Sequence, residues 1–167
     1  MTPALWATLF AVLLIAAATG DALSRRLSNW LALSIATAFI AAAMSAGMPL
    51  SLMFLHLVTG LALALGAYVL SALGVLGGGD PKLLGAAGAW LGPSAAVLFL
   101  MMTAIAGGVL SLVLLLWVFC RYLIRRRTGG GPRGGRMAAP RVPYGCAIAA
   151  GAILALSQSW WSSTLNP

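Results

Sequence analysis

Acidic residues are almost absent from this chain. Asp21 and Asp80 are its two carboxylates among 167 residues, against ten Lys and Arg, and charged residues make up 7% of the sequence. A soluble domain usually carries about 25% charged residues, because its surface faces water. The scarcity of charge, with 62% hydrophobic residues and a mean hydropathy of +1.02, excludes a soluble globular domain and indicates a membrane protein.

Histidine and cysteine are also scarce. The chain has one histidine, His56, and two cysteines, Cys120 and Cys146, with no Cys-x-x-Cys pair and no His-Glu-x-x-His motif. These absences argue against a zinc site, a redox motif and a histidine-activated serine, so we expect no metal or cofactor. We interpret His56 as an interfacial or packing residue and the cysteines as packed or lipid-facing thiols.

Apolar runs fill most of the chain, at residues 3–20, 30–48, 52–76, 82–91, 95–119 and 143–161. A chain of this length has room for about five or six spanning helices of roughly 20 residues each. We therefore expect an all-α polytopic membrane protein with about six transmembrane helices in a single domain, residues 1–167. Gly92 and Pro93 should end the fourth helix early, and Gly60 and Gly66 should allow close helix packing.

The basic residues follow alternate apolar runs. They are Arg25 and Arg26 after the first run, Lys82 after the third, and Arg121, Arg125, Arg126, Arg127, Arg133, Arg136 and Arg141 between the last two. If each run crosses once, all ten fall on one side, which the positive-inside rule makes cytoplasmic. This topology places the N- and C-termini outside. No Lys or Arg precedes the first run, which favours a retained helix over a cleaved secretory signal.

Residues 121–142 form a basic, glycine-rich segment that we expect to be a cytoplasmic loop. Such charge can indicate RNA binding, but the segment lacks interleaved aromatic side chains on which bases could stack. Attraction to anionic lipid head groups, about 1 kcal/mol per basic residue near the surface, accounts for the charge. We therefore expect lipid contacts and no nucleic acid, with Arg25 and Arg26 as further candidate contacts to lipid or substrate.

The two aspartates occupy matching contexts. Asp21 and Asp80 each follow a glycine, end an apolar segment and precede a Lys or Arg by a few residues. The expected topology puts both on the cytoplasmic face. Two carboxylates are the minimum set for aspartic-protease chemistry, in which an ionised group takes a proton from water and its protonated partner polarises the scissile carbonyl. If they approach each other in a partly dry cavity, repulsion makes them share one proton.

Three glycines precede the second aspartate. The run at residues 77–79 is a poor helix former, so the backbone is expected to unwind just before Asp80. Irregular backbone at membrane depth is tolerated where protein covers it or where it lines a wet cavity. The alternative is that Asp80 is a helix N-cap, with Pro81 at the first helical position, and this role is compatible with catalysis.

Three motifs resemble those of one known family. Residues 77–83 resemble the Gly-x-Gly-Asp-x-Lys motif of the type IV prepilin peptidases, with Gly77, Gly79 and Lys82 around Asp80. Asp21 with residues 25–29 resembles the first aspartate motif of these aspartic membrane proteases. Residues 143–148 resemble their C-terminal Pro-Tyr/Phe-Gly element. The small size is similar to the short CpaA/TadV-like branch that serves Tad/Flp pili.

The resemblance implies a specific activity. It implies that Asp21 and Asp80 cleave the leader of a prepilin or pseudopilin after a Gly that precedes the hydrophobic helix. Cleavage would occur at the cytoplasmic face of the bacterial inner membrane. Lys82 or Arg25 is then a candidate partner for an acidic residue near the mature pilin N-terminus. The paired-cysteine region of longer, methylating members is absent, so no methyltransferase activity is expected.

Two other classes of protein stay open on the sequence. A non-enzymatic membrane subunit or small transporter of a secretion or pilus complex could use the aspartates structurally, and a related intramembrane protease could act on another substrate. Substituting Asp by Asn keeps the shape of the side chain but removes the base. A scaffold should tolerate this change, whereas a protease should not.

Overall fold

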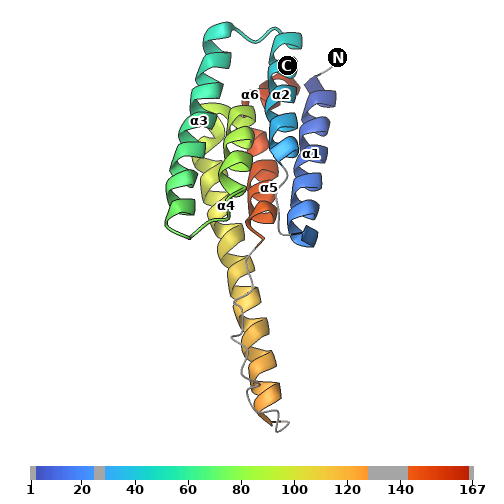
Figure 1. Ribbon diagram of the computed structural model, residues 1–167. Helices are drawn as coiled ribbons and strands as arrows, with labels where there is room; N and C mark the ends of the chain where they lie inside the picture. The colour runs from blue at the N-terminus through green and yellow to red at the C-terminus, as the bar shows by residue number, and fades with distance from the viewer. Residues whose placement is uncertain (1–2, 25–28, 128–142, 166–167) are drawn as a thin grey trace.

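The structure, a computed structural model, describes residues 3–24, 29–127 and 143–165, and these ranges contain helices and no strand. The elements are α1 (Pro3–Ser24), α2 (Asn29–Ser45), α3 (Leu50–Ala72), α4 (Asp80–Arg127), α5 (Tyr144–Ala155), the 3-10 helix η1 (Leu156–Gln158) and α6 (Trp160–Leu165). They form a bundle from which the second part of α4 extends (Figure 1). The all-α prediction is confirmed.

Helix length divides these elements into two groups. Residues 4–23, 50–72 and 80–124 lie in helices long and apolar enough to cross a membrane, while α2 and residues 144–158 are apolar but shorter. The interpretation as a membrane protein is therefore supported. The count of about six crossings, and the outside location of both termini, stay predictions.

Glycines with positive φ end two of the helices. Gly74 has φ 77° and Gly47 has φ 68°, a region that L side chains rarely adopt. At the end of α3, the amides of Gly74 and Val75 donate to carbonyls in the last helical turn, which is the Schellman arrangement. The apolar run at residues 52–76 predicts a helix that ends at Leu76. This predicted end is wrong, because Gly74 ends α3 at Ala72.

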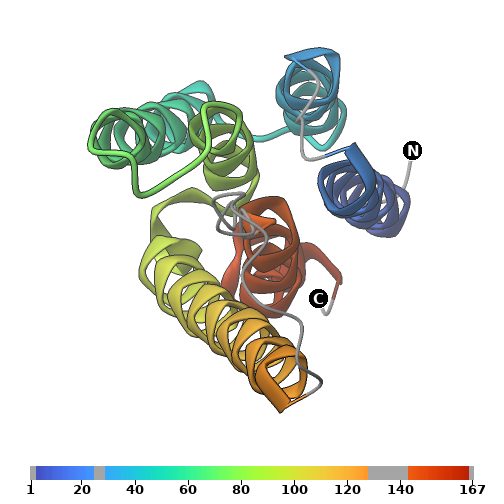
Figure 2. The same ribbon diagram turned by 60° about the horizontal axis from the view of Figure 1, so that its bottom comes forward.

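A break at Gly92 divides α4 into two parts. Gly92 has φ 72° and ψ −176°, a conformation open essentially to glycine alone, and Pro93 follows it. The chain reverses direction there (Figure 1), so residues 80–91 form a half-helix and residues 93–127 form a long arm. The expected short fourth helix ending at Gly92 and Pro93 is confirmed. Figure 2 shows the half-helix standing between α2, α3 and α5.

Two side chains hold the C-terminal end of the half-helix. The carbonyl of Ala89 has no helical donor, because the residue four positions on is Pro93, which lacks an N–H. His56 Nδ1 lies 2.9 Å from this carbonyl, so Nδ1 must carry the proton and donate it. Trp161 Nε1 donates to the next carbonyl, that of Trp90, at 2.9 Å. His56 is 1% exposed, so it is a packing residue and not an interfacial one.

Trp90 is the centre of the aromatic core. Its ring stacks on Phe10 at 4.7 Å and lies 6.0 Å from Phe39 and 5.3 Å from Trp161. Its indole N–H donates to the carbonyl of Ile35 at 2.7 Å. The tryptophan pair at 160–161 ends the last apolar run, and a tryptophan at such a position favours the membrane interface. Trp161 is nevertheless fully buried, because its N–H donates to a carbonyl inside the bundle.

Small residues let α3 and the half-helix pack closely. A Cβ on Gly60 would lie 2.6 Å from the carbonyl oxygen of Gly85 and 2.9 Å from Ala89 Cβ. A Cβ on Gly85 would lie 2.7 Å from Ala64 Cβ. The predicted packing role of Gly60 is therefore confirmed, whereas Gly66 faces open space.

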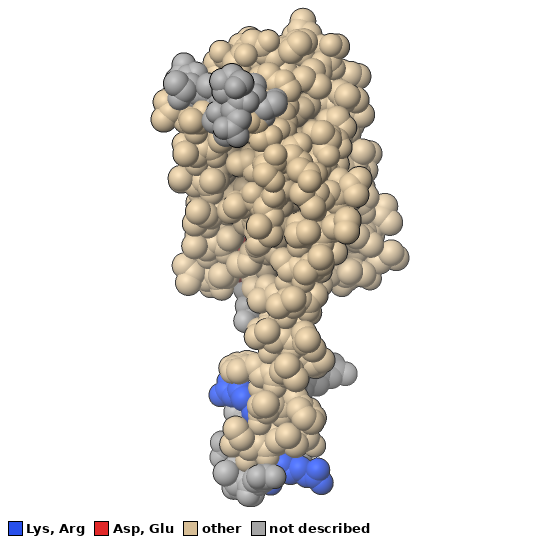
Figure 3. Space-filling view, turned by 180° about the vertical axis from the view of Figure 1, so that it is seen from behind, with Lys and Arg blue, Asp and Glu red and all other residues tan. Residues whose placement is uncertain are grey.

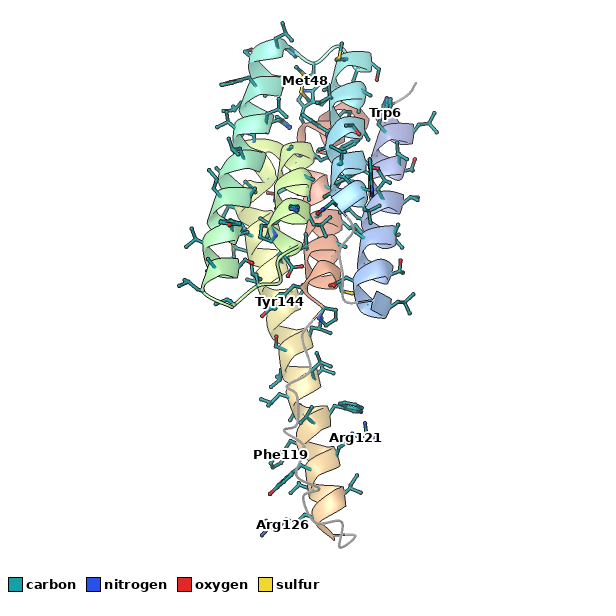
Figure 4. The ribbon with its side chains drawn as sticks, viewed as in Figure 1. Trp6, Met48, Phe119, Arg121, Arg126 and Tyr144 are labelled. Atoms are coloured by element: carbon teal, nitrogen blue, oxygen red, sulfur yellow. The ribbon has the colours of Figure 1, made fainter. Side chains whose placement is uncertain are left out.

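The arm carries the basic end of α4 away from the bundle. It is helical through Arg127, so the predicted loop at 121–142 does not begin at Arg121; residues 128–142 lie outside the described ranges. Arginine is a good helix former, which allows the helix to continue to this point. The basic side chains of Arg121 and Arg126 lie far along the arm (Figures 3 and 4), and the Arg121 guanidinium stands 4.7 Å from the ring centre of Trp117.

Candidate active site

The two aspartates lie at the same end of the bundle. Asp21 is in the last turn of α1 and Asp80 is the first residue of the half-helix, and both of these helix ends lie toward the same end of the bundle (Figure 1). Asp21 is 6% exposed and Asp80 is 5% exposed. The end of the bundle therefore holds two buried carboxylates.

A glycine amide orients the carboxylate of Asp80. Its Oδ2 accepts a hydrogen bond from the Gly77 N–H at 2.8 Å, while its own N–H donates to the Gly77 carbonyl at 3.2 Å. Residues 73–79 are not helical, which confirms that the backbone unwinds before Asp80. The carboxylate thus turns back to the preceding loop. It orders this loop and does not act as a conventional N-cap of the helix that follows.

A second glycine amide orients the carboxylate of Asp21. Its Oδ2 accepts from the Gly145 N–H at 2.7 Å, across 124 positions of sequence. Gly145 lies in the first turn of α5, where the helix dipole also favours a negative charge. A Cβ on Gly145 would fall 2.8 Å from this oxygen and 3.0 Å from the carboxyl carbon, so only glycine allows the approach.

Gly145 is a site residue that the sequence-based assignment of the site did not include. Its motif, Pro-Tyr-Gly at 143–145, is part of the family resemblance, but no sequence pattern around the motif indicates that it contacts Asp21. The ring of Tyr144 lies beside Gly107 of the arm, and a Cβ built on Gly107 would lie 3.3 Å from this ring. This contact positions the start of α5. Figure 4 places Tyr144 at the end of the bundle where the aspartates lie.

The remaining motif residues have different positions. The Gly79 carbonyl accepts from the amides of Lys82 and Leu83 at 3.2 and 3.4 Å, and so starts the half-helix. Lys82 extends toward α2, where its Nζ donates to Asn29 Oδ1 at 2.7 Å. Within the described part of the chain, Lys82 forms no ion pair. Arg25 and Arg26 lie outside the described residues.

The thiols lie apart from each other. Cys146 Sγ donates to the Ala18 carbonyl at 3.3 Å, and Cys120 is exposed on the arm. Both are free thiols, one half-buried and one exposed. Over residues 3–24, 29–127 and 143–165, no three His, Cys, Asp or Glu side chains come together as a metal site would require.

Comparison with known proteins identifies the family. Residues 8–112 match the family model described as the type IV leader peptidase family, a range that includes Asp21 and Asp80. No curated protein and no solved structure matches the chain. The matched range covers more than half of the sequence, from α1 to the middle of the arm. The chain belongs to the type IV leader peptidase family.

Proposed function

We propose that this protein is an aspartic endopeptidase that removes the leader from type IV or Flp-like prepilins at the cytoplasmic face of the bacterial inner membrane. The observation that carries the proposal is the pair of buried carboxylates of Asp21 and Asp80 at one end of the bundle, each oriented by one glycine amide. Both of these hydrogen bonds go to Oδ2, so among the residues that the structure describes Oδ1 of each carboxylate is left for water and substrate.

The chemistry needs one proton shared by the pair. Two buried carboxylates within reach of each other's charge favour a singly protonated state, because ionising both is costly. The ionised carboxylate takes a proton from water, whose oxygen attacks the scissile carbonyl carbon. The protonated partner gives its proton to the carbonyl oxygen, which forms a tetrahedral diol.

Collapse of the diol completes the reaction. The C–N bond breaks, and the leaving nitrogen receives the proton that the first carboxylate had taken from water. The second carboxylate recovers its proton from the diol, so the pair returns to its starting state. Water is consumed, and one peptide becomes a carboxylate and an amine.

The surroundings of the pair support cleavage of an extended segment. The irregular backbone at residues 73–79 lies beside Asp80. Its peptide groups can bond to a substrate or to water, whereas those of a helix are used within the helix. Lys82, Arg121 and Arg126 lie toward the same end of the molecule as the aspartates. Under the positive-inside rule this end is cytoplasmic, which is where a basic leader remains.

Substitution of each aspartate tests the function. We expect Asp21→Asn and Asp80→Asn each to reduce leader cleavage of a co-expressed Flp-type prepilin by about 10²–10⁴-fold, because each change removes an acid–base group. Cleavage is measured as the ratio of processed to unprocessed pilin, with membrane accumulation of each variant checked.

Thr37→Val provides a matched control. The Thr37 hydroxyl bonds only to carbonyls of its own helix, so this variant should process the prepilin at the wild-type rate. Near-wild-type cleavage by either aspartate variant would show that the two-aspartate mechanism is wrong. Failure of the wild-type protein itself would instead mean that the substrate class is wrong.

A further inference from the structure

A groove of about 500 Å³ lies between α2 and α3, with the half-helix as its floor. Small residues from all three helices line it, namely Ala32, Ala36, Gly60, Ala64, Gly85 and Ala86. The leucines at its rim are exposed, with 53% of Leu33 and 61% of Leu61 accessible. The groove is therefore a shallow, apolar slot on the membrane-facing side of the bundle.

The shape of this groove suits a helix. The lining residues of the half-helix run from Lys82 to Ala89 and those of α3 from Leu57 to Ala64, so the floor and this wall each follow a straight helical face. Each face extends about 10 Å, or two turns of helix. Alanine and glycine at such a surface allow the backbone of another helix to approach closely, which is the main source of helix association in lipid.

One end of the groove is polar and adjoins the aspartate site. Lys82 and Asn29, joined by a hydrogen bond of 2.7 Å, line this end, and Lys82 is two residues after Asp80. The ammonium group bonds a neutral amide and forms no ion pair with a carboxylate among the described residues. A carboxylate on a bound partner would be attracted to this position.

We propose that this groove binds the first two turns of the substrate's apolar helix, with the start of that helix at Lys82. The inference rests on the proposed peptidase function and adds where the substrate is held. A helix placed in this way leads the chain that precedes it past Asp80 and Asp21, which is where the scissile bond must lie. The partner is an apolar helix with a carboxylate near its start.

Photo-cross-linking tests binding without requiring cleavage. A photo-activatable amino acid is placed at Leu61, in the groove. The Asp80→Asn variant is used, because it is expected to leave the bound substrate uncleaved. The control position is Leu70, which is 44% exposed on the opposite face of α3. We expect a cross-link to a co-expressed Flp-type prepilin from position 61 and none from position 70. A cross-link only to lipid or to a second copy of this chain would overturn the proposal.

Filling the groove tests its role in turnover. Ala32→Leu adds bulk inside the groove, whereas Ala41→Leu adds the same bulk on the opposite, exposed face of α2. We expect Ala32→Leu to reduce cleavage of the full prepilin about tenfold or more, and Ala41→Leu to leave it unchanged. Equal rates for the two variants would overturn the proposal.

A short substrate separates this inference from the peptidase function. A peptide with the leader and a few following residues, but without the apolar helix, cannot use the groove. Ala32→Leu should cleave it at the wild-type rate, while Asp21→Asn and Asp80→Asn should cleave neither substrate. If the aspartate variants remain active, the peptidase assignment fails; if Ala32→Leu loses both substrates equally, only the groove assignment fails.

Lys82 is tested with a matched pair of prepilins, one with a carboxylate in the first two turns of its helix and one with the corresponding amide. We expect the wild-type protein to prefer the acidic substrate about tenfold, in line with a charged hydrogen bond. Lys82→Ala should bring this ratio close to one. An unchanged ratio would show that Lys82 does not contact the substrate's carboxylate.

Discussion

Each aspartate is held by a glycine amide at a distance that a larger residue would not permit. Gly77 holds Asp80 from the preceding loop, and Gly145 holds Asp21 from a helix at the other end of the chain. The two contacts differ in how much they depend on the fold. The first is local and joins positions three apart, whereas the second requires α1 and α5 to pack together.

A methyl group on Gly145 should disturb the site without unfolding the protein. In Gly145→Ala the new Cβ would overlap the Asp21 carboxylate, and a displacement of about 1 Å can cost up to a hundredfold in rate. We expect prepilin cleavage to fall about tenfold to a hundredfold, measured as the processed fraction over time.

Gly108→Ala is the control for this change, since nothing lies within 4 Å of a Cβ there. It should keep wild-type cleavage, and the two variants are directly comparable because both glycines are helical. If Gly145→Ala cleaves as fast as Gly108→Ala, the Gly145 contact does not position Asp21.

At the scale of elements, the half-helix is the part of the fold that carries the site. Its first residue is Asp80, and its other end is fixed by the hydrogen bonds from His56 and Trp161. Close contact with α3 at Gly60 and Gly85 fixes it from the side. Any movement at its C-terminal end is therefore transmitted to the carboxylate, because the segment is a short rigid helix.

Two substitutions of His56 separate its hydrogen bond from its ring. His56→Phe keeps an aromatic ring against Phe39 but leaves the Ala89 carbonyl without a donor, which costs about 1–3 kcal/mol for a buried group. His56→Asn loses the ring but keeps an N–H near the position of Nδ1.

We expect His56→Phe to lower the thermal unfolding temperature in detergent and to slow prepilin cleavage, and His56→Asn to recover part of the cleavage rate. Both quantities are measured on purified protein. If the two variants lose cleavage to the same extent, the hydrogen bond to Ala89 does not position the half-helix.

At the scale of the whole molecule, one end holds the two aspartates and the basic residues. The aspartates, Lys82 and the basic end of the arm all lie toward the end where α1 finishes, and α3 begins at the opposite end (Figure 1). With an apolar bundle between them, the two ends are expected to face different sides of the membrane, the basic one inside.

Thiol labelling measures this orientation. The Arg126 side chain is exposed beyond the apolar span that ends at Ile124. In a chain with Cys120→Ala and Cys146→Ala, a membrane-impermeant maleimide should therefore label Arg126→Cys in inverted membrane vesicles and not in intact cells. The matched control is Ser51→Cys, exposed at the start of α3, in a chain with Cys120→Ala and Cys146→Ala. This thiol should be labelled with the outer membrane permeabilised and the inner membrane intact. The reverse pattern would place the aspartates outside.

Local signals in the sequence were sufficient to predict that lipid surrounds the chain, where its helices break, and which side chains are candidates for catalysis. The apolar composition requires lipid around the chain. Gly74 and Gly92 interrupt helices through their own backbone preferences, and the glycines at 77–79 keep the segment before Asp80 non-helical. With Asp21 and Asp80 as the two acids, the sequence also determined which carboxylates could form a catalytic pair.

Tertiary structure decided the contacts that no local pattern encodes. The reversal at Gly92 makes the short helix a half-helix beside α3, and packing buries Trp161 where its sequence position favoured an interface. The amide of Gly145 reaches Asp21 across 124 positions only because α5 docks on α1. Composition and backbone preference act over a few residues, whereas the partner of a buried carboxylate depends on which distant helices pack together.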